Sequence, residues 1–143
     1  MKGPWLQHVS SIIPIGGQEL VRAFYGRLLG LEEKEPPHTL AHLNLVWFVA
    51  GDEIELLFVP SERVPDTSDQ RHLCLAVEDL DDYRCRLTEA GYTITEAELI
   101  PNRPRFFCRD PFGNLVELTT ILDEDEYVAV GQHTQEIVFP QIG

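Results

Sequence analysis

The stretch Asp110-Pro111-Phe112-Gly113-Asn114-Leu115-Val116-Glu117-Leu118 is the most informative part of the sequence for the fold, because it places a turn directly before a strand. Asp, Pro, Gly and Asn are residues that turns favour, so a turn is expected over 110–114. Apolar and polar side chains then alternate, which predicts a strand with Val116 and Leu118 on one face and Glu117 on the other. The run Arg105-Phe106-Phe107-Cys108 predicts the strand that enters the turn.

The rest of the sequence contains an internal repeat that includes this stretch. Three landmarks recur at nearly one spacing: a histidine in an apolar run, a glycine that ends a helical pattern, and a glutamate in an apolar-Glu-Leu strand. They are His8 and His72 (72 − 8 = 64), Gly30 and Gly91 (91 − 30 = 61), and Glu55 and Glu117 (117 − 55 = 62). The repeat predicts an α+β protein built from two β-α-β-β-β modules, because each half reads as strand, helix and further strands.

The helices are predicted from apolar residues at helical spacing. In the first half Leu20, Phe24 and Leu28 recur every four residues, and Val21 and Leu29 widen this stripe. In the second half Asp79 is a suitable N-cap, and the expected stripe is Leu80, Tyr83 and Leu87. Gly30 and Gly91 stand where a helix C-terminus favours a left-handed residue.

Residues 1–122 are expected to form one domain, with module one over about 5–60 and module two over about 70–122. The remaining residues, 123–143, are expected to be an acidic C-terminal tail, since they begin Asp-Glu-Asp-Glu. At 143 residues the chain is long enough to bury a core without disulfides.

The chain is strongly acidic, with 11 Lys and Arg against 24 Asp and Glu and a net charge of −13. This charge argues against nucleic acid as a partner, because affinity for phosphate backbones comes mainly from Lys and Arg. It also slows the approach of anionic substrates unless basic groups in the site counter it. No apolar run predicts a signal peptide or a membrane span, and the three cysteines show no CxxC spacing, so a cytoplasmic protein is expected.

The repeat predicts a metal site. Strand alternation places His72 on one face with the small residues Cys74 and Ala76, and it places Glu117 on the face away from the helix. His8 and Glu55 are expected at equivalent places in the first half. Imidazole nitrogen together with carboxylate oxygen suits Zn, Ni, Co, Mn or Fe(II), so one divalent ion is expected on His8, Glu55, His72 and Glu117. Glu55 and Glu117 are also the expected catalytic residues, because a glutamate that leaves the ion can act as general base.

Three segments together resemble the vicinal oxygen chelate superfamily of glyoxalases, fosfomycin-resistance proteins, bleomycin-resistance proteins and extradiol dioxygenases. They are His8-Val9, residues 22–31 (Arg-Ala-Phe-Tyr-Gly-Arg-Leu-Leu-Gly-Leu) and residues 110–118, and the resemblance spans about 6–121. It implies paired modules whose mixed or antiparallel sheet curls around a metal cavity, and a homodimer. It also implies metal ligands at His8, His72 and Glu117, with a variable fourth at Glu55, as in glyoxalase I. Residues 100–105 lack the Gly pair that glyoxalase I places near glutathione.

Three functions follow from the resemblance. The first is a glyoxalase-like, metal-dependent lyase or isomerase that transfers a proton next to a carbonyl of a small oxygen-chelating substrate. In it Arg103 and Arg105 would bind an anionic substrate group. The second is an Fe(II) extradiol-type dioxygenase with His8, His72 and Glu117 as its ligand triad, against which a fourth carboxylate argues. The third is a non-enzymatic binding protein of the bleomycin-resistance type, whose groove would be lined by Trp47, Phe107 and Phe112.

Overall fold

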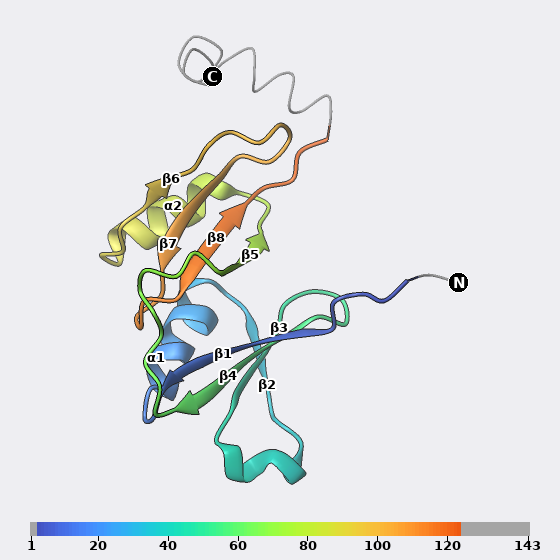
Figure 1. Cartoon of the computed structure of the whole chain (residues 1–143). Coiled ribbons are helices and arrows are strands. Elements are labelled where there is room, and N and C mark those ends of the chain that lie inside the picture. The colour runs from blue at the N-terminus through green and yellow to red at the C-terminus, as the bar shows by residue number, and fades with distance from the viewer. Residues whose placement is uncertain (1–2, 124–143) are drawn as a thin grey trace. The chain divides into compact units, whose positions relative to one another are not determined.

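The computed structural model describes residues 3–123, and these form two four-stranded mixed sheets with few helices (Figure 1). The elements in chain order are β1 (His8–Pro14), α1 (Gln18–Val21), η1 (Arg22–Leu28), β2 (Glu32–Lys34), η2 (His38–Leu43), β3 (Val46–Val49), β4 (Glu55–Ser61), β5 (His72–Ala76), α2 (Leu80–Glu89), β6 (Thr95–Glu96), β7 (Arg105–Arg109) and β8 (Leu115–Thr119). The predicted acidic tail lies outside the described residues apart from Asp123. No helix within residues 3–123 is long and apolar enough to cross a membrane.

The two sheets have the same strand order. One runs β1-β4-β3-β2 and the other β5-β8-β7-β6. In each, the first strand of the module is parallel to the last strand, and the other neighbours are antiparallel. The α+β fold and the duplicated β-α-β-β-β unit predicted from the spacing of His, Gly and Glu are therefore confirmed.

The first helix differs from its prediction. Leu29 N–H donates to Phe24 O, five residues back, so the chain widens from an α-turn to a π-helix over Arg22–Leu28. The wider turn changes which side chains face the sheet: Val21, Phe24, Tyr25 and Leu29 are buried. The prediction that Leu20 belongs to the buried stripe is wrong, since 54% of its surface is exposed.

The second helix agrees with its prediction. The Asp79 side chain accepts a hydrogen bond from Asp82 N–H, which satisfies one of the unpaired donors of the first turn. Leu80 and Leu87 are buried. Gly91, just beyond the helix, has φ +92°, the left-handed conformation that glycine adopts without steric cost.

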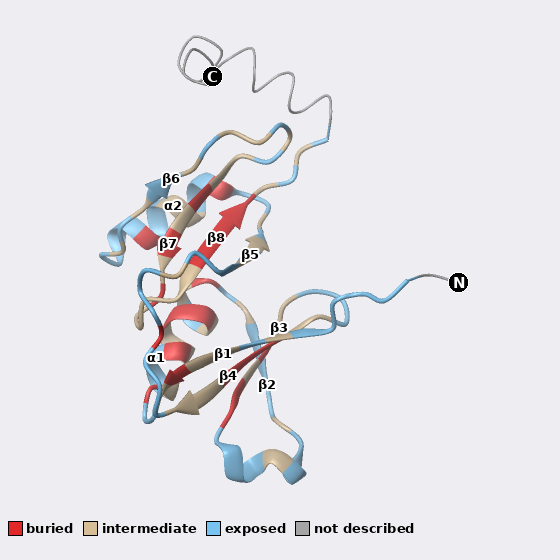
Figure 2. Cartoon of the chain, viewed as in Figure 1, coloured by how far each residue is buried: buried red, intermediate tan, exposed pale blue. Residues whose placement is uncertain are grey.

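Taken by itself, and within residues 3–123, each sheet is covered by its own helix on one face (Figure 2); the other face is called the uncovered face. In the first module Tyr25 is in ring contact with Phe48 and Phe58, at centroid distances of 6.3 and 4.4 Å. In the second module the guanidinium of Arg84 on α2 lies 4.9 Å from the ring centroid of Phe106. Strand alternation therefore turns the neighbours of these buried residues, including Phe107, to the uncovered face.

The chain divides into two compact units that do not coincide fully with the modules. Within the described residues, one unit comprises 3–69 and 110–114, and the other comprises 70–109 and 115–123. The turn between β7 and β8 thus belongs to the first unit, although its strands belong to the second.

Asp110 explains this assignment. Its carboxylate is 4% exposed and accepts hydrogen bonds from the backbone N–H groups of Phe112 and Asn114, at 2.9 Å each. It also accepts from Asn114 Nδ2 at 3.0 Å and from the buried Tyr25 hydroxyl at 2.8 Å. Phe112 packs so closely on Gly17 that an added Cβ would lie 2.8 Å from its ring. Phe112 is thus a packing residue in the first unit.

The Tyr25–Asp110 bond gives the first prediction. Among the hydrogen bonds described above, Tyr25 provides the side-chain donor to Asp110 that comes from outside the turn. Tyr25→Phe removes this donor and should lower the free energy of unfolding by about 1–3 kcal/mol. Asp110→Asn should cost at least as much, because an amide cannot accept all four bonds. Urea unfolding followed by circular dichroism measures both, with the exposed turn variant Asp52→Asn as control. Unfolding curves that coincide with wild type for both variants would contradict this assignment.

Candidate functional site

The uncovered face of the second sheet brings His72 and Glu117 together. Glu117 lies on β8, opposite Cys74 of β5 and Phe107 of β7. His72 Nε2 is 3.0 Å from Glu117 Oε1, and Glu117 is 7% exposed. The predicted second-half pair is therefore a direct contact in the structure.

The hydrogen bonds of His72 show what this contact requires. His72 Nδ1 is 2.9 Å from the backbone carbonyl of Gln70, and a carbonyl only accepts, so Nδ1 carries the proton. In the neutral ring Nε2 is then a second acceptor, and it faces a carboxylate oxygen. Two acceptors at 3.0 Å are held together only by a shared cation, either a proton or a metal ion. Metal-binding histidines commonly donate their other ring N–H to a backbone carbonyl in this way.

The spacing of the two atoms also suits a metal ion. Ligand atoms about 2.1 Å from an ion and at right angles lie roughly 3.0 Å apart, which is the separation of Nε2 and Oε1. The pair therefore fits two neighbouring ligands of one divalent ion. Within residues 3–123, however, no three His, Cys, Asp or Glu side chains come close enough together to hold an ion.

Arginine and aromatic side chains surround Glu117. Arg105 Nη1 donates to Glu117 Oε1 at 3.3 Å, and its guanidinium lies 5.4 Å from the Phe107 ring centroid. Phe107 meets the His72 ring edge-on at 4.9 Å. Burial and the nearby Glu117 carboxylate raise the pKa of the Cys74 thiol to about 12, while Arg103 and Arg105 oppose this shift. The predicted residues Arg103, Arg105 and Phe107 are thus all in the surroundings of Glu117 or Cys74.

The first sheet brings His8 and Glu55 together through an intermediate residue. His8 and Glu55 are register partners on β1 and β4. His8 Nδ1 donates to Gln7 Oε1 at 2.7 Å, and Gln7 Nε2 donates to Glu55 Oε1 at 2.8 Å. Gln7, which no sequence pattern indicated, thereby links the two predicted ligands. With Nδ1 donating to Gln7, the acceptor nitrogen of the neutral His8 ring is Nε2.

Glu55 has a second partner in Lys34. Lys34 Nζ lies 2.5 Å from Glu55 Oε2 and 5.6 Å from the Trp47 ring centroid. The hydrogen bond from Lys34 is the main cause that lowers the pKa of Glu55 below its ordinary 4.5, followed by the bond from Gln7. The Trp47 indole N–H makes the smallest of these contributions to the lowered pKa of Glu55. Within the described residues this N–H has no acceptor at hydrogen-bond geometry, so it acts on Glu55 by proximity alone.

The two histidine–glutamate pairs are therefore not equivalent, contrary to the prediction. In the first sheet His8 lies opposite Glu55, whereas in the second His72 lies opposite Leu115. Counted from each histidine, the counterpart of Glu117 is Leu57, which pairs with Ser10 as Glu117 pairs with Cys74. The turns 50–54 and 110–114 before β4 and β8 have the same length, so the difference lies in the glutamate itself, which stands two positions earlier on β4 than on β8. Its face is kept because the difference is even.

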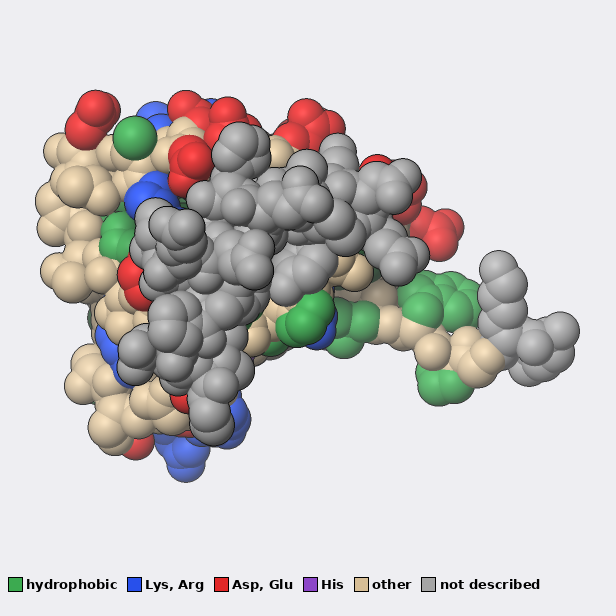
Figure 3. Space-filling model, turned by 90° about the horizontal axis from the view of Figure 1, so that it is seen from above, with side chains coloured by type: hydrophobic (Ala, Val, Ile, Leu, Met, Phe, Trp, Pro, Cys, Tyr) green, Lys and Arg blue, Asp and Glu red, His purple; other side chains and the backbone are tan. Residues whose placement is uncertain are grey.

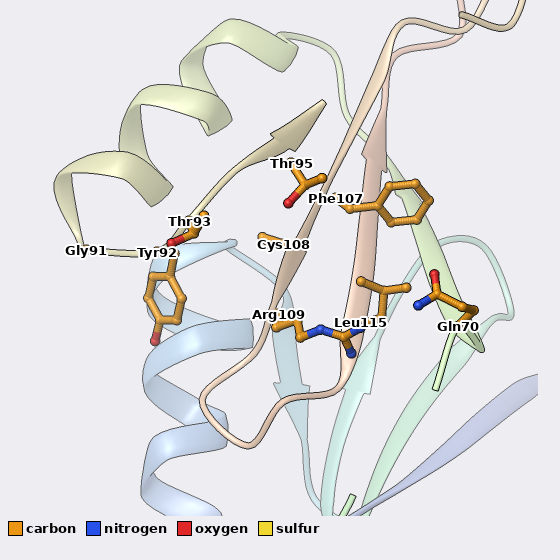
Figure 4. A pocket seen from close by; sticks show the side chains of 9 residues that line it. All are labelled: Gln70, Gly91, Tyr92, Thr93, Thr95, Phe107, Cys108, Arg109 and Leu115. Atoms are coloured by element: carbon orange, nitrogen blue, oxygen red, sulfur yellow. The ribbon is translucent and has the colours of Figure 1, made fainter. Parts of the chain in front are cut away.

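A cavity of about 490 Å³ lies in the second unit (Figure 4). It is lined by Gln70, Gly91, Tyr92, Thr93, Thr95, Phe107, Cys108, Arg109 and Leu115. Phe107 belongs both to this lining and to the surroundings of His72. Arg109 could have been predicted to line this cavity, because strand alternation places it on one face of β7 with Arg105 and Phe107. No pattern in the sequence indicated the loop residues 91–93.

Comparison with known proteins agrees with the fold. The family model of the Glyoxalase/Bleomycin resistance protein/Dioxygenase superfamily matches residues 5–118. A glyoxalase family protein from Bacillus anthracis is 27% identical, with a TM-score of 0.76 over 85% of this chain and 98% of that chain. No curated protein is similar enough in sequence to count as a match.

Two further solved structures share the fold at lower identity. A fosfomycin resistance protein, FosX, from Listeria monocytogenes is 14% identical, with a TM-score of 0.69 over 90% of this chain and 99% of that chain. An antibiotic binding protein, TnmS3, from a Streptomyces species is 24% identical, with a TM-score of 0.64 over 85% and 98%. Because the family model covers most of the sequence, the chain belongs to the glyoxalase/bleomycin resistance protein/dioxygenase superfamily, as its motifs predicted.

Proposed function

We propose that the chain is a metal-dependent lyase or isomerase of the glyoxalase-like type, acting on a small oxygen-chelating carbonyl substrate by proton transfer. The observation that carries the proposal is the contact of His72 Nε2 with Glu117 Oε1, two acceptors at 3.0 Å that need a cation between them. His8 is proposed as the third ligand, because Gln7 fixes its Nδ1 and leaves Nε2 to bind. When bound, the ion would polarise the substrate oxygen as a Lewis acid.

Glu55 is proposed as a residue that positions His8, in place of the predicted fourth ligand. Both of its oxygens already accept hydrogen bonds, one from Gln7 and one from Lys34. Residues that orient a metal ligand in this way typically contribute 10- to 100-fold to metal affinity. Because Lys34 lowers the pKa of Glu55, this carboxylate is also a weaker proton acceptor than an ordinary glutamate.

Glu117, when it leaves the ion, is then the proposed general base. It is nearly buried, and its Oε1 lies on the face that carries His72, Arg105 and Phe107. In an isomerisation it would take the proton from the hydroxyl-bearing carbon beside the carbonyl and return it to the carbonyl carbon, while the hydroxyl proton would pass to the former carbonyl oxygen. Arg105 would stay within reach of the substrate's anionic group. The predicted homodimer and cytoplasmic location remain predictions of the same proposal.

An extradiol-type dioxygenase is the second candidate, and one observation favours it. A fourth carboxylate on the ion argued against this class from sequence, but Glu55 is held by Lys34 and Gln7. His8, His72 and Glu117 alone form the two-His-one-carboxylate set of non-haem Fe(II) oxygenases. The third function, a binding protein without metal, predicts ligand binding that survives chelation.

Metal content tests the proposed site. Wild-type protein reconstituted with Zn, Ni, Co or Mn and desalted should retain about one ion per chain, measured by plasma mass spectrometry. Glu117→Ala should lose most of it, since it removes the charged ligand. Glu96→Ala removes the same charge from a residue that pairs with Arg84 of α2, and this variant should retain the ion. A wild-type protein that retains no ion would overturn the proposal in favour of the binding protein.

The role of Glu55 is tested with Gln7. If Glu55 acts through Gln7, Glu55→Gln and Gln7→Leu should each weaken metal affinity by about tenfold, and the double variant should be no weaker than either. Calorimetric titration measures these affinities, and Gln18→Leu is a matched surface control. If Glu55 is instead a direct ligand, the double variant will bind the ion more weakly than Gln7→Leu alone does.

Oxygen consumption separates the two enzyme classes. Protein loaded anaerobically with Fe(II) and mixed with a panel of catechols should consume no oxygen if it is a lyase or isomerase. A His72→Ala variant measures the background oxygen uptake caused by free iron. Uptake that depends on His72 and yields a ring-cleaved product would replace the lyase assignment with the dioxygenase.

A further inference from the structure

The two edges of the first sheet differ in charge. β1 and β2 are its outermost strands. β2 spans Glu32–Lys34, and all three of its residues are charged and exposed. β1 spans His8–Pro14, which is seven residues, and it contains no Asp, Glu, Lys or Arg. Because charged side chains on an edge strand hinder pairing with another strand, β2 is protected against such pairing and β1 is not.

Backbone groups on the outer edge of β1 are open to a further strand. The carbonyl of Gln7 accepts a hydrogen bond from the first residue of β4, so Gln7 faces β4. Successive residues of a strand direct their N–H and C=O groups to opposite sides, so His8, Ser10 and Ile12 face outward. Asn114 Nδ2 donates to Ile12 O at 3.4 Å. Within residues 3–123, no hydrogen bond joins the backbone groups of His8 and Ser10 on this edge, and both residues are exposed.

Large apolar side chains at both ends of β1 are exposed as well. Trp5 is 70% and Leu6 is 60% exposed before the strand, and Ile15 is 69% exposed after it. Residues 3–17 contain no Asp, Glu, Lys or Arg, although 24% of the chain is charged. Apolar side chains follow the N-terminal segment at the right of Figure 3. Covering this segment removes apolar surface from water, which stabilises a complex.

The charge of the chain restricts what can cover this uncharged edge. The net charge is −13, and acidic side chains gather along one edge of the face shown in Figure 3. A positively charged partner would be attracted to those acids rather than to an uncharged strand. Two copies of this chain repel each other wherever their acids meet, so they approach best on a surface without charge. A strand edge is also self-complementary, because two copies related by a two-fold axis pair as antiparallel strands.

We propose that the outer edge of β1 is the surface on which two copies of this chain pair, strand against antiparallel strand. The N–H and C=O groups of His8 and Ser10 would then bond to the same two residues of the second copy. Trp5 and Leu6 of each copy would cover apolar surface of the other. The first sheets of the two copies thereby join into one continuous sheet. This inference gives the predicted homodimer a specific interface, and it requires neither a metal ion nor the proposed reaction.

Sedimentation velocity and amide hydrogen exchange test the interface together. Wild type should sediment as a dimer, and Trp5→Ser should weaken dimerisation at least about tenfold, as loss of a buried interface tryptophan commonly does. Ser10→Pro should be monomeric, because it removes an outward N–H and leaves the hydrogen bonds to β4 in place. The N–H groups of His8 and Ser10 should exchange at least about tenfold more slowly in the wild-type dimer than in monomeric Trp5→Ser.

Val64→Ser is the matched control for Trp5→Ser, because Val64 is 76% exposed and lies outside the uncharged run. If circular dichroism shows that Ser10→Pro does not fold, Ser10→Lys takes its place, since a charge on the edge should also give a monomer. A monomeric wild type would overturn the inference. A dimer in which His8 and Ser10 exchange as fast as in the monomer would overturn it too. Neither result changes the metal content that tests the proposed function.

Discussion

A carboxylate that leaves water must be satisfied by hydrogen-bond donors or by a cation, and this constraint governs both the fold and the site. Asp110 meets it completely: its own turn provides three donors and the Tyr25 hydroxyl a fourth. All four come from groups that stay in place, so Asp110 needs nothing from outside. The turn that carries it thereby belongs to the first unit, and the Tyr25–Asp110 bond joins the Phe-Tyr segment to the Asp-Pro-Phe-Gly-Asn segment.

Glu117 meets the same constraint in an exchangeable way. One partner is the His72 imidazole nitrogen on β5, which needs a proton or an ion to bridge it to the carboxylate. The other is the Arg105 guanidinium on β7, the strand on the opposite side of β8. Glu55 stands between these cases, since a lysine and an amide satisfy it and lower its pKa. All three residues are carboxylates, but they differ in how easily their hydrogen-bond partners can be replaced by other groups. That difference, more than burial, separates a structural carboxylate from one available for chemistry.

Much of the fold could be predicted because it depends on local patterns: strand alternation, the Asp79 cap and glycines with positive φ. The π-helix could not be predicted, because its register is chosen by the fit of Tyr25 against Phe58 and Asp110, residues far away in sequence. For the candidate site, alternation placed His72 and Glu117 on one face, where their side chains are in contact. It missed Gln7 and Lys34, since neither has a spacing of its own and both act only through the strand pairing that brings them to Glu55.

The duplication explains why the two halves look alike and also where they differ. Both sheets place a histidine, an acid, a basic side chain and an aromatic ring on the uncovered face: Lys34 stands over Trp47 as Arg105 stands over Phe107. The strand register is the same in both sheets, but the acid is the first residue of β4 and the third residue of β8. One histidine therefore meets its acid directly and the other through an amide. A displacement of two positions keeps the acid on its face and changes only its distance from the histidine. It can thus convert an acid that touches its histidine into one that only orients it, without altering either core.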